Sequence, residues 1–145
     1  MDLREYQEAA YSTCTPECYT HEYLTLGLIS ELGEIAGKLA KRVRGDHVPD
    51  EDIMQEIGDV AWMVAVKARL DGETLELNRD MLAERPLKTL IWQYLQDVRG
   101  VAKMSCLISL SKELGIDFQA ALDANIKKLE SRQRRGVIQG NGDNR

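Results

Sequence analysis

Two pairs of carboxylates, each pair three residues apart, are the feature of this sequence best suited to chemistry. Glu31 and Glu34 lie in ISELGEIAGK, and Glu56 and Asp59 lie in EIGDVAW. At about 100° per residue, each pair falls on one stripe of a helix, beside an apolar face. If the two helices pack antiparallel, as their short connection favours, the four carboxylates converge on one cleft. Such a cluster repels itself unless it is neutralised, and an all-oxygen ligand set suits Mg²⁺ or Mn²⁺.

Cationic side chains could complete such a site. Asn125, Lys128 and Arg132 share one stripe of a predicted helix near the C-terminus, and Lys38 lies on the same stripe as the first carboxylate pair. Metal-bound carboxylates opposite lysine and arginine form a site for a polyphosphate, whose oxygens the metals and cations share. The spacing therefore predicts a metal-dependent polyphosphate site.

The same carboxylates also have a plainer interpretation. Glutamates three residues apart are common on solvated helix faces, where they bind nothing. A competing function is thus a non-enzymatic helical interaction protein, in which the carboxylates are merely solvated.

Two further groups near the N-terminus are open to two interpretations each. Cys14, Cys18 and His21 could bind zinc, but they offer three ligands with no fourth close by, which favours reduced thiols. Four other side chains before the first carboxylate pair could line a base pocket or pack in the core. These are Tyr6, Gln7, Tyr19 and Tyr23.

Composition and periodicity predict one all-α domain over residues 1–145. The chain is 43% hydrophobic and 30% charged and has only three prolines, which suits a soluble globular protein with one core. Apolar residues recur every three or four positions in segments 22–44, about 50–70, 86–114 and 117–135, and no segment alternates like a strand. With a short helix over 6–11, this predicts a helical bundle of four to five helices. In the first long helix we expect the buried face to hold Leu24, Leu28, Leu32, Ile35, Leu39 and Val43.

Charge and hydropathy exclude several classes of function. The net charge of -5 disfavours nucleic acid as a partner of the whole surface. The longest apolar run, residues 60–66, is far short of the ~20 residues that span a bilayer. The charged N-terminus lacks a signal-peptide core, and three cysteines do not suggest a disulfide framework. We therefore expect no membrane association and a cytoplasmic location, in the host cytoplasm if the protein is phage-encoded.

The carboxylate spacing resembles the signature of the MazG-like all-α nucleoside triphosphate pyrophosphohydrolases. In this sequence 21 residues separate Glu31-x-x-Glu34 from Glu56-x-x-Asp59. The segments EYQEAA, LGLISELGEIAGKLAKRVRGD and NIKKLESRQRRGVIQGNGDNR are also similar to the short, stand-alone and often phage-encoded members. The similarity covers roughly residues 4–70 and 114–145.

The resemblance implies hydrolysis of a nucleoside triphosphate between the α and β phosphates, giving a nucleoside monophosphate and pyrophosphate. It assigns Mg²⁺ coordination, with Mn²⁺ as a substitute, to all four carboxylates. Glu31 or Glu34 would also orient or deprotonate the attacking water. Nucleotide contacts fall to Lys38, Asn125, Lys128 and Arg132. Relatives form dimers or tetramers, so we expect a homodimer or homotetramer, while the base, the sugar and a modified or alarmone substrate stay open.

Three departures from the family pattern stand out. Ser30 precedes the first signature glutamate, where many members have a second acid, and Met63 stands where relatives often have an aromatic residue. Residues from about 71 to 111 have no counterpart in the short members. We expect this insertion to be helical and to enlarge the subunit interface or to wall the base pocket.

Overall fold

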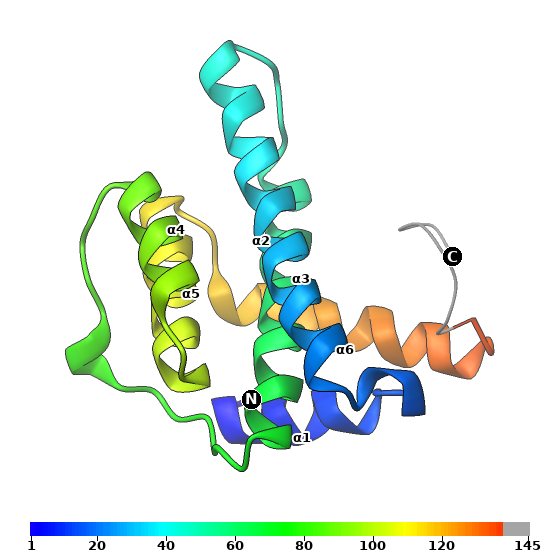
Figure 1. Cartoon of the computed structure of the whole chain (residues 1–145). Coiled ribbons are helices and arrows are strands. Elements are labelled where there is room, and N and C mark those ends of the chain that lie inside the picture. The colour runs from blue at the N-terminus through cyan, green and yellow to red at the C-terminus, as the bar shows by residue number, and fades with distance from the viewer. Residues whose placement is uncertain (138–145) are drawn as a thin grey trace.

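The fold was analysed in a computed structural model, which describes residues 1–137. All regular structure in this range is helical (Figure 1). The elements are α1 (Leu3–Ser12), η1 (Pro16–Cys18), α2 (His21–Arg44), α3 (Asp50–Leu70), η2 (Arg79–Met81), α4 (Leu87–Gln96), α5 (Gly100–Glu113) and α6 (Phe118–Arg134). The all-α prediction is confirmed for these residues, with six α-helices instead of four or five. The last part of the C-terminal resemblance, residues 138–145, lies outside the described residues.

Local sequence signals fix the ends of the helices. Asp2 and Glu5 form a capping box at the start of α1, each side chain accepting from the other's backbone N–H at 2.8 Å. Asp117 caps α6 through the backbone N–H of Ala120. Gly45 ends α2 with a φ of 101°, a left-handed conformation that glycine adopts without strain. The chain then turns within residues 45–49 into α3, so α2 and α3 form an antiparallel hairpin, as predicted.

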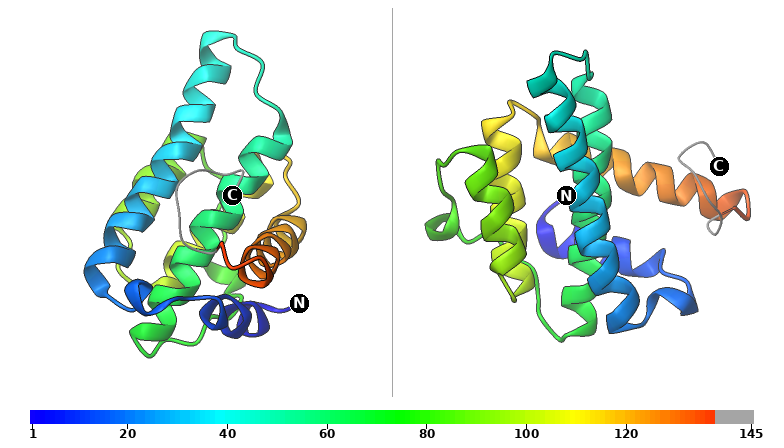
Figure 2. Two further views of the ribbon diagram at one scale, coloured as in Figure 1. Left: turned by 90° about the vertical axis from the view of Figure 1, so that its right-hand side faces the viewer. Right: turned by 45° about the horizontal axis from the view of Figure 1, so that its top comes forward.

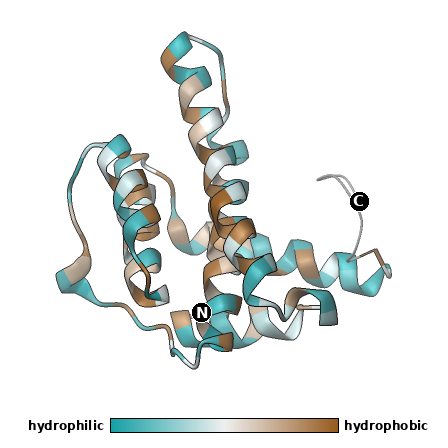
Figure 3. Cartoon of the chain, in the orientation of Figure 1, coloured by the Kyte–Doolittle hydropathy of each residue, from teal (hydrophilic) through white to brown (hydrophobic). Residues whose placement is uncertain are grey.

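Helix α3 is the centre of the bundle. It packs against α1, α2, α5 and α6, and nearly every residue from 56 to 66 is buried. Figures 1 and 2 show α2 running along α3, while α6 crosses α3 at a steep angle. In Figure 3 the hydrophobic colour gathers on the part of α2 and α3 that meets the other helices. Because α3 touches most of the bundle, side chains on it can meet partners from several elements.

A glycine allows α6 to approach α3 closely. A Cβ atom on Gly58 would lie 2.9 Å from Cβ of Asn125 and 3.0 Å from the backbone oxygen of Ala121. Both distances are shorter than side-chain packing tolerates, so a larger residue would force the helices apart. The missing side chain thus brings Asn125 next to the residues that flank Gly58.

The predicted single helix over 86–114 is wrong. The backbone is extended at Asp97 and Arg99, which separates α4 from α5, and the two helices fold back on each other. Val98, one of the apolar residues whose spacing over 86–114 predicts a single buried stripe, is 86% exposed in the connection. The hairpin lets α5 bury its apolar face on α3 while α4 packs on α5.

The apolar face of α2 ends earlier than its sequence pattern. The face is buried from Leu24 to Ile35, Leu39 is partly buried, and Val43 is 90% exposed. The end of the α2–α3 hairpin extends beyond the other helices (Figure 1). The apolar side chains that continue the pattern there therefore have no further helix to pack against.

The insertion is part of the core and not a peripheral addition. Its extended stretch buries Leu75, and α5 buries Val101, Met104 and Leu107 among others. Among the described residues, no helix is both long and apolar enough to cross a bilayer.

Candidate metal and nucleotide site

Three of the four predicted carboxylates meet at the α2–α3 interface. Glu31 of α2 and Glu56 and Asp59 of α3 each offer an oxygen, and these oxygens lie within 4.8 Å of one another. The three-residue spacing places Glu56 and Asp59 on one side of α3, and the antiparallel hairpin brings Glu31 opposite them. Glu56 is only 5% exposed. A partly buried group of carboxylates at this spacing suits a hard divalent cation with oxygen ligands.

Glu34 lies at the open edge of this group. It is exposed and is not one of the three residues whose oxygens converge. Its charge nevertheless contributes to raising the pKa of both Glu31 and Glu56. Glu34 is therefore an electrostatic neighbour of the cluster with a carboxylate that faces solvent.

Two lysines pair with two of the three clustered carboxylates. Lys38 of α2 places its Nζ 3.0 Å from Oε1 of Glu56. Lys128 of α6 places its Nζ 2.5 Å from Oδ1 and 2.7 Å from Oδ2 of Asp59. Both predicted lysines thus bind carboxylates instead of standing free opposite them. The site therefore contains both carboxylates and ammonium groups, and here they form ion pairs with one another.

The pKa values of Glu31 and Glu56 stay raised despite these lysines. Burial, followed by the negative charges of Asp59, Glu34 and Glu56, raises the pKa of Glu31 to about 7. Burial also raises the pKa of Glu56, although the ion pair with Lys38 opposes the shift. A divalent cation bound among the three carboxylates would relieve this repulsion, so the donor set fits such an ion.

Asn125, a predicted nucleotide contact, faces Asp59. Its Nδ2 donates to Oδ1 of Asp59 at 2.8 Å, and its Oδ1 accepts from the hydroxyl of Tyr6 at 3.1 Å. Arg132 lies one turn beyond Lys128 on α6, and its side chain is buried. Asn125 and Lys128 of the α6 stripe therefore both contact Asp59 directly.

The candidate base-pocket residues divide into core and surface. Gln7 is buried, and its amide donates to the backbone oxygen of Glu73 at 2.9 Å and accepts from the backbone N–H of Leu75 at 2.9 Å. Gln7 thus fastens the start of the insertion to α1. Tyr19 and Tyr23 are exposed.

The alternative zinc ligands are only partly brought together: the thiols of Cys14 and Cys18 are hydrogen-bonded to each other, but His21 does not join them. Among the described residues, Cys14, Cys18 and His21 do not form a three-ligand group, and Nδ1 of His21 lies 3.2 Å from Asp71. Met63, which stands where relatives often have an aromatic residue, is buried in the core. Its thioether fills the space beside Gly27, where a Cβ would come within 2.7 Å of Sδ.

A tyrosine of the insertion was missed by sequence reasoning. The hydroxyl of Tyr94, on α4, is buried and has no hydrogen-bond partner among the described residues. Burial is the main cause of its raised pKa, and the charge of Glu31 contributes. The insertion therefore brings a polar group into the electrostatic neighbourhood of the carboxylates. Helical periodicity places Tyr94 on the apolar stripe of residues 86–114 but does not indicate this proximity.

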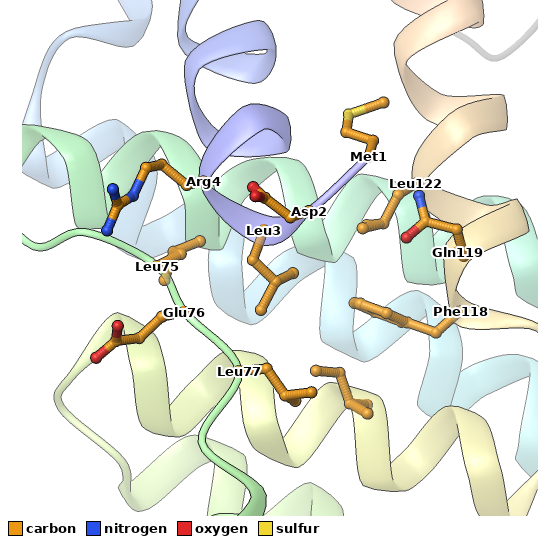
Figure 4. Close-up of a pocket in the computed structure, with 11 residues that line it drawn as sticks. Met1, Asp2, Leu3, Arg4, Leu75, Glu76, Leu77, Phe118, Gln119 and Leu122 are labelled. Atoms are coloured by element: carbon orange, nitrogen blue, oxygen red, sulfur yellow. The ribbon is translucent and has the colours of Figure 1, made fainter.

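The pocket in Figure 4 is a separate feature. It has a volume of about 470 Å³ and lies between the N-terminal residues, the extended stretch at 75–77 and the start of α6. Its lining is largely apolar, with Leu3, Leu77 and Phe118 prominent, and includes none of the clustered carboxylates. It is not the predicted polyphosphate site.

Comparison with known proteins gives one relationship. No family model and no solved structure matches the chain. The chain is 30% identical to the Gene 37 protein of Mycobacterium phage L5, over a 157-residue alignment that spans all of both proteins. The chain belongs to the family of that phage protein. The Gene 37 name specifies no activity.

Proposed function

We propose that the protein is a MazG-like nucleoside triphosphate pyrophosphohydrolase, which hydrolyses its substrate to a nucleoside monophosphate and pyrophosphate. The observation that carries this proposal is the convergence of Glu31, Glu56 and Asp59 at a site where two lysines also meet. The resemblance of the paired signature to that family supports the choice of reaction. The phage relative is consistent with a phage-type member but names no activity.

The carboxylates divide into two roles in this proposal. Glu31, Glu56 and Asp59 hold Mg²⁺, or Mn²⁺ in its place, because their oxygens already converge. The metal would supply charge stabilisation at the phosphoryl oxygens and a lower pKa for water. Glu34 keeps an exposed carboxylate one turn along α2, and it is thereby suited to orient the attacking water and accept its proton.

In this proposal the two lysines bind phosphate once a divalent cation neutralises their carboxylate partners. Lys38 and Lys128 now balance Glu56 and Asp59. With a divalent cation balancing those charges, the ammonium groups can turn to the phosphate oxygens, and Arg132 would add a further cation on α6. This exchange of counterions couples metal binding to binding of the polyphosphate.

A nucleotide panel tests the proposal. Canonical and modified nucleoside triphosphates are incubated with the protein and Mg²⁺ or Mn²⁺, and pyrophosphate release is measured. We expect release from at least one nucleotide, abolished by EDTA and reduced at least 100-fold in Glu56→Gln. Glu51→Gln, an exposed change in the first turn of the same helix, is the matched control and should retain activity. No metal-dependent release from any nucleotide would contradict the proposal.

The non-enzymatic interaction module is the second candidate, and one observation favours it. The insertion exposes apolar side chains, with Trp92 66% exposed beside Leu95 and Val98. In the enzyme proposal the same surface belongs to a homodimer or homotetramer. Light scattering of the wild type and of Trp92→Ala separates the two candidates. A wild type that self-associates and releases pyrophosphate, with a Trp92→Ala variant that no longer self-associates, favours the oligomeric enzyme. A monomeric wild type without pyrophosphate release favours the interaction module.

A further inference from the structure

A chain of hydrogen bonds runs from the core to the carboxylate cluster. The hydroxyl of Tyr6, on α1, is fully buried and lies 3.1 Å from Oδ1 of Asn125 and 3.4 Å from the backbone oxygen of Gly58. Asn125, only 3% exposed, passes the chain on through Nδ2 to Oδ1 of Asp59 at 2.8 Å. Three helices, α1, α6 and α3, thus contribute one residue each.

The direction of this chain is fixed by chemistry. An ionised carboxylate only accepts hydrogen bonds, so the amide must present its NH₂ group to Asp59. Its oxygen then faces Tyr6, whose hydroxyl can donate. Burial, together with the charge of Asp59, raises the pKa of Tyr6, so the hydroxyl retains the proton that it donates. Rotating the amide by 180° would set its oxygen against the carboxylate and leave two buried acceptors facing each other.

Close packing keeps the Asn125 side chain from reaching a nucleotide. Gly58 brings α6 so close that Cβ of Asn125 lies 2.9 Å from the place where a Cβ on Gly58 would be. The amide is packed between α3 and Tyr6, and it can reach a nucleotide only by leaving Asp59 and a buried hydroxyl unsatisfied.

We propose that Tyr6 is a positioning residue of the metal site, which acts through Asn125 to hold the Asp59 carboxylate in its ligating orientation. The inference rests on the proposed function for the identity of the ligand, a divalent cation. It moves Asn125 from a nucleotide contact to a support of Asp59. Asn125 fixes Oδ1, so Oδ2 can be offered to the cation once Lys128 has turned away. Hydrogen-bonded supports of metal ligands commonly alter affinity about 10- to 100-fold when removed.

Mn²⁺ binding without nucleotide tests the inference, with free Mn²⁺ measured by electron paramagnetic resonance. The variants are Tyr6→Phe, Asn125→Ala and the double variant, each checked for cooperative thermal unfolding. We expect each single change to weaken Mn²⁺ binding about 10-fold or more. Because Tyr6 acts only through Asn125, the double variant should bind no more weakly than Asn125→Ala alone. Wild-type affinity in Tyr6→Phe, or losses that multiply in the double variant, would overturn the inference.

The matched control is Tyr11→Phe, which removes a hydroxyl from the same helix. The Tyr11 ring contacts Tyr19 and Arg69, away from Asn125, so Mn²⁺ affinity should be unchanged. A second measurement needs no metal: the side-chain amide resonances of Asn125 should shift in Tyr6→Phe and stay in place in Tyr11→Phe. Unshifted resonances in Tyr6→Phe would overturn the inference on their own.

The outcome is distinguishable from failure of the proposed function. If no nucleotide is hydrolysed but Mn²⁺ binding still depends on Tyr6, the hydrolase proposal fails and the positioning role stands. If pyrophosphate is released and Tyr6→Phe binds Mn²⁺ as the wild type does, only the positioning role fails. A wild-type protein that binds no Mn²⁺ would overturn both.

Discussion

The ammonium of Lys128 lies 2.5 Å and 2.7 Å from the two carboxylate oxygens of Asp59 and so occupies the side of Asp59 where the proposed divalent cation would bind. The pair joins the last helix to the central one, 69 residues apart in sequence. In the proposed reaction a divalent cation and the lysine compete for the same carboxylate, and this competition gives the first prediction.

Replacing Lys128 by methionine should change metal binding and hydrolysis in opposite directions. Removing the competing ammonium should tighten Mn²⁺ binding several-fold, because Asp59 is no longer paired. The same change should reduce kcat/KM for the triphosphate at least 10-fold, since a phosphate contact is lost, and should lower the free energy of unfolding of the metal-free protein by about 1–2 kcal/mol. Lys127→Met, an exposed neighbour, is the control. Weaker Mn²⁺ binding in Lys128→Met would contradict this account.

The stability of the metal-free protein should fall as the pH rises from about 5 to 8. The pKa of Glu31 is about 7 in the folded protein and near its ordinary value of 4.5 in the unfolded chain. The folded state therefore binds more protons between these values, and stability is lost as the pH passes through about 7. Glu31→Gln should flatten this dependence, and Mg²⁺ should stabilise the wild type more at pH 8 than at pH 5. Urea unfolding at several pH values measures this pH dependence. A stability that rises between pH 5 and pH 8 would contradict the raised pKa of Glu31.

Substituting alanine at Gly58 should loosen the contact between α3 and α6. The added Cβ would clash with Asn125 and with the backbone of Ala121, so we expect a loss of about 1–3 kcal/mol in the free energy of unfolding. Mn²⁺ binding should weaken as well, because Asn125 moves away from Asp59. Gly33→Ala is the matched control at an exposed position of α2, where no atom lies within 4 Å of the new Cβ. That control should raise the free energy of unfolding by up to about 1 kcal/mol. Equal effects at both glycines would show that helix packing is not involved.

The substitution Tyr94→Phe should leave the free energy of unfolding unchanged or raise it. The Tyr94 hydroxyl is buried without a partner among the described residues, so removing it eliminates a desolvated polar group. We expect the free energy of unfolding to stay level or rise by about 1 kcal/mol, whereas Tyr6→Phe should lower it by a similar amount. Thermal and urea unfolding of the two variants side by side give the comparison. A destabilised Tyr94→Phe protein would mean that the hydroxyl has a stabilising contact after all.

The carboxylate site could be predicted from sequence because its determinants are local. Helical periodicity placed each acidic pair on one stripe, and the short link after Gly45 made the hairpin antiparallel. These two facts suffice to bring Glu31 toward Glu56 and Asp59.

The role of Asn125 could not be predicted in the same way. Its position on the α6 stripe is local, but its contact with Asp59 depends on how closely α6 approaches Gly58, which is a property of tertiary packing. The division of the insertion at Asp97 has a similar origin, since no proline interrupts the apolar pattern and only packing on α3 makes the chain fold back. For this reason deletion of residues 71–111 would expose the core, and point changes such as Trp92→Ala are the better probe of the insertion.

The position of bond cleavage tests the central claim most directly. The protein is incubated with Mg²⁺ and the most reactive triphosphate of the panel, and the products are followed by phosphorus-31 NMR in the wild type and in Glu56→Gln. The account predicts equal amounts of nucleoside monophosphate and pyrophosphate from the wild type and none from Glu56→Gln. Release of orthophosphate with a nucleoside diphosphate, or identical products from both proteins, would contradict it.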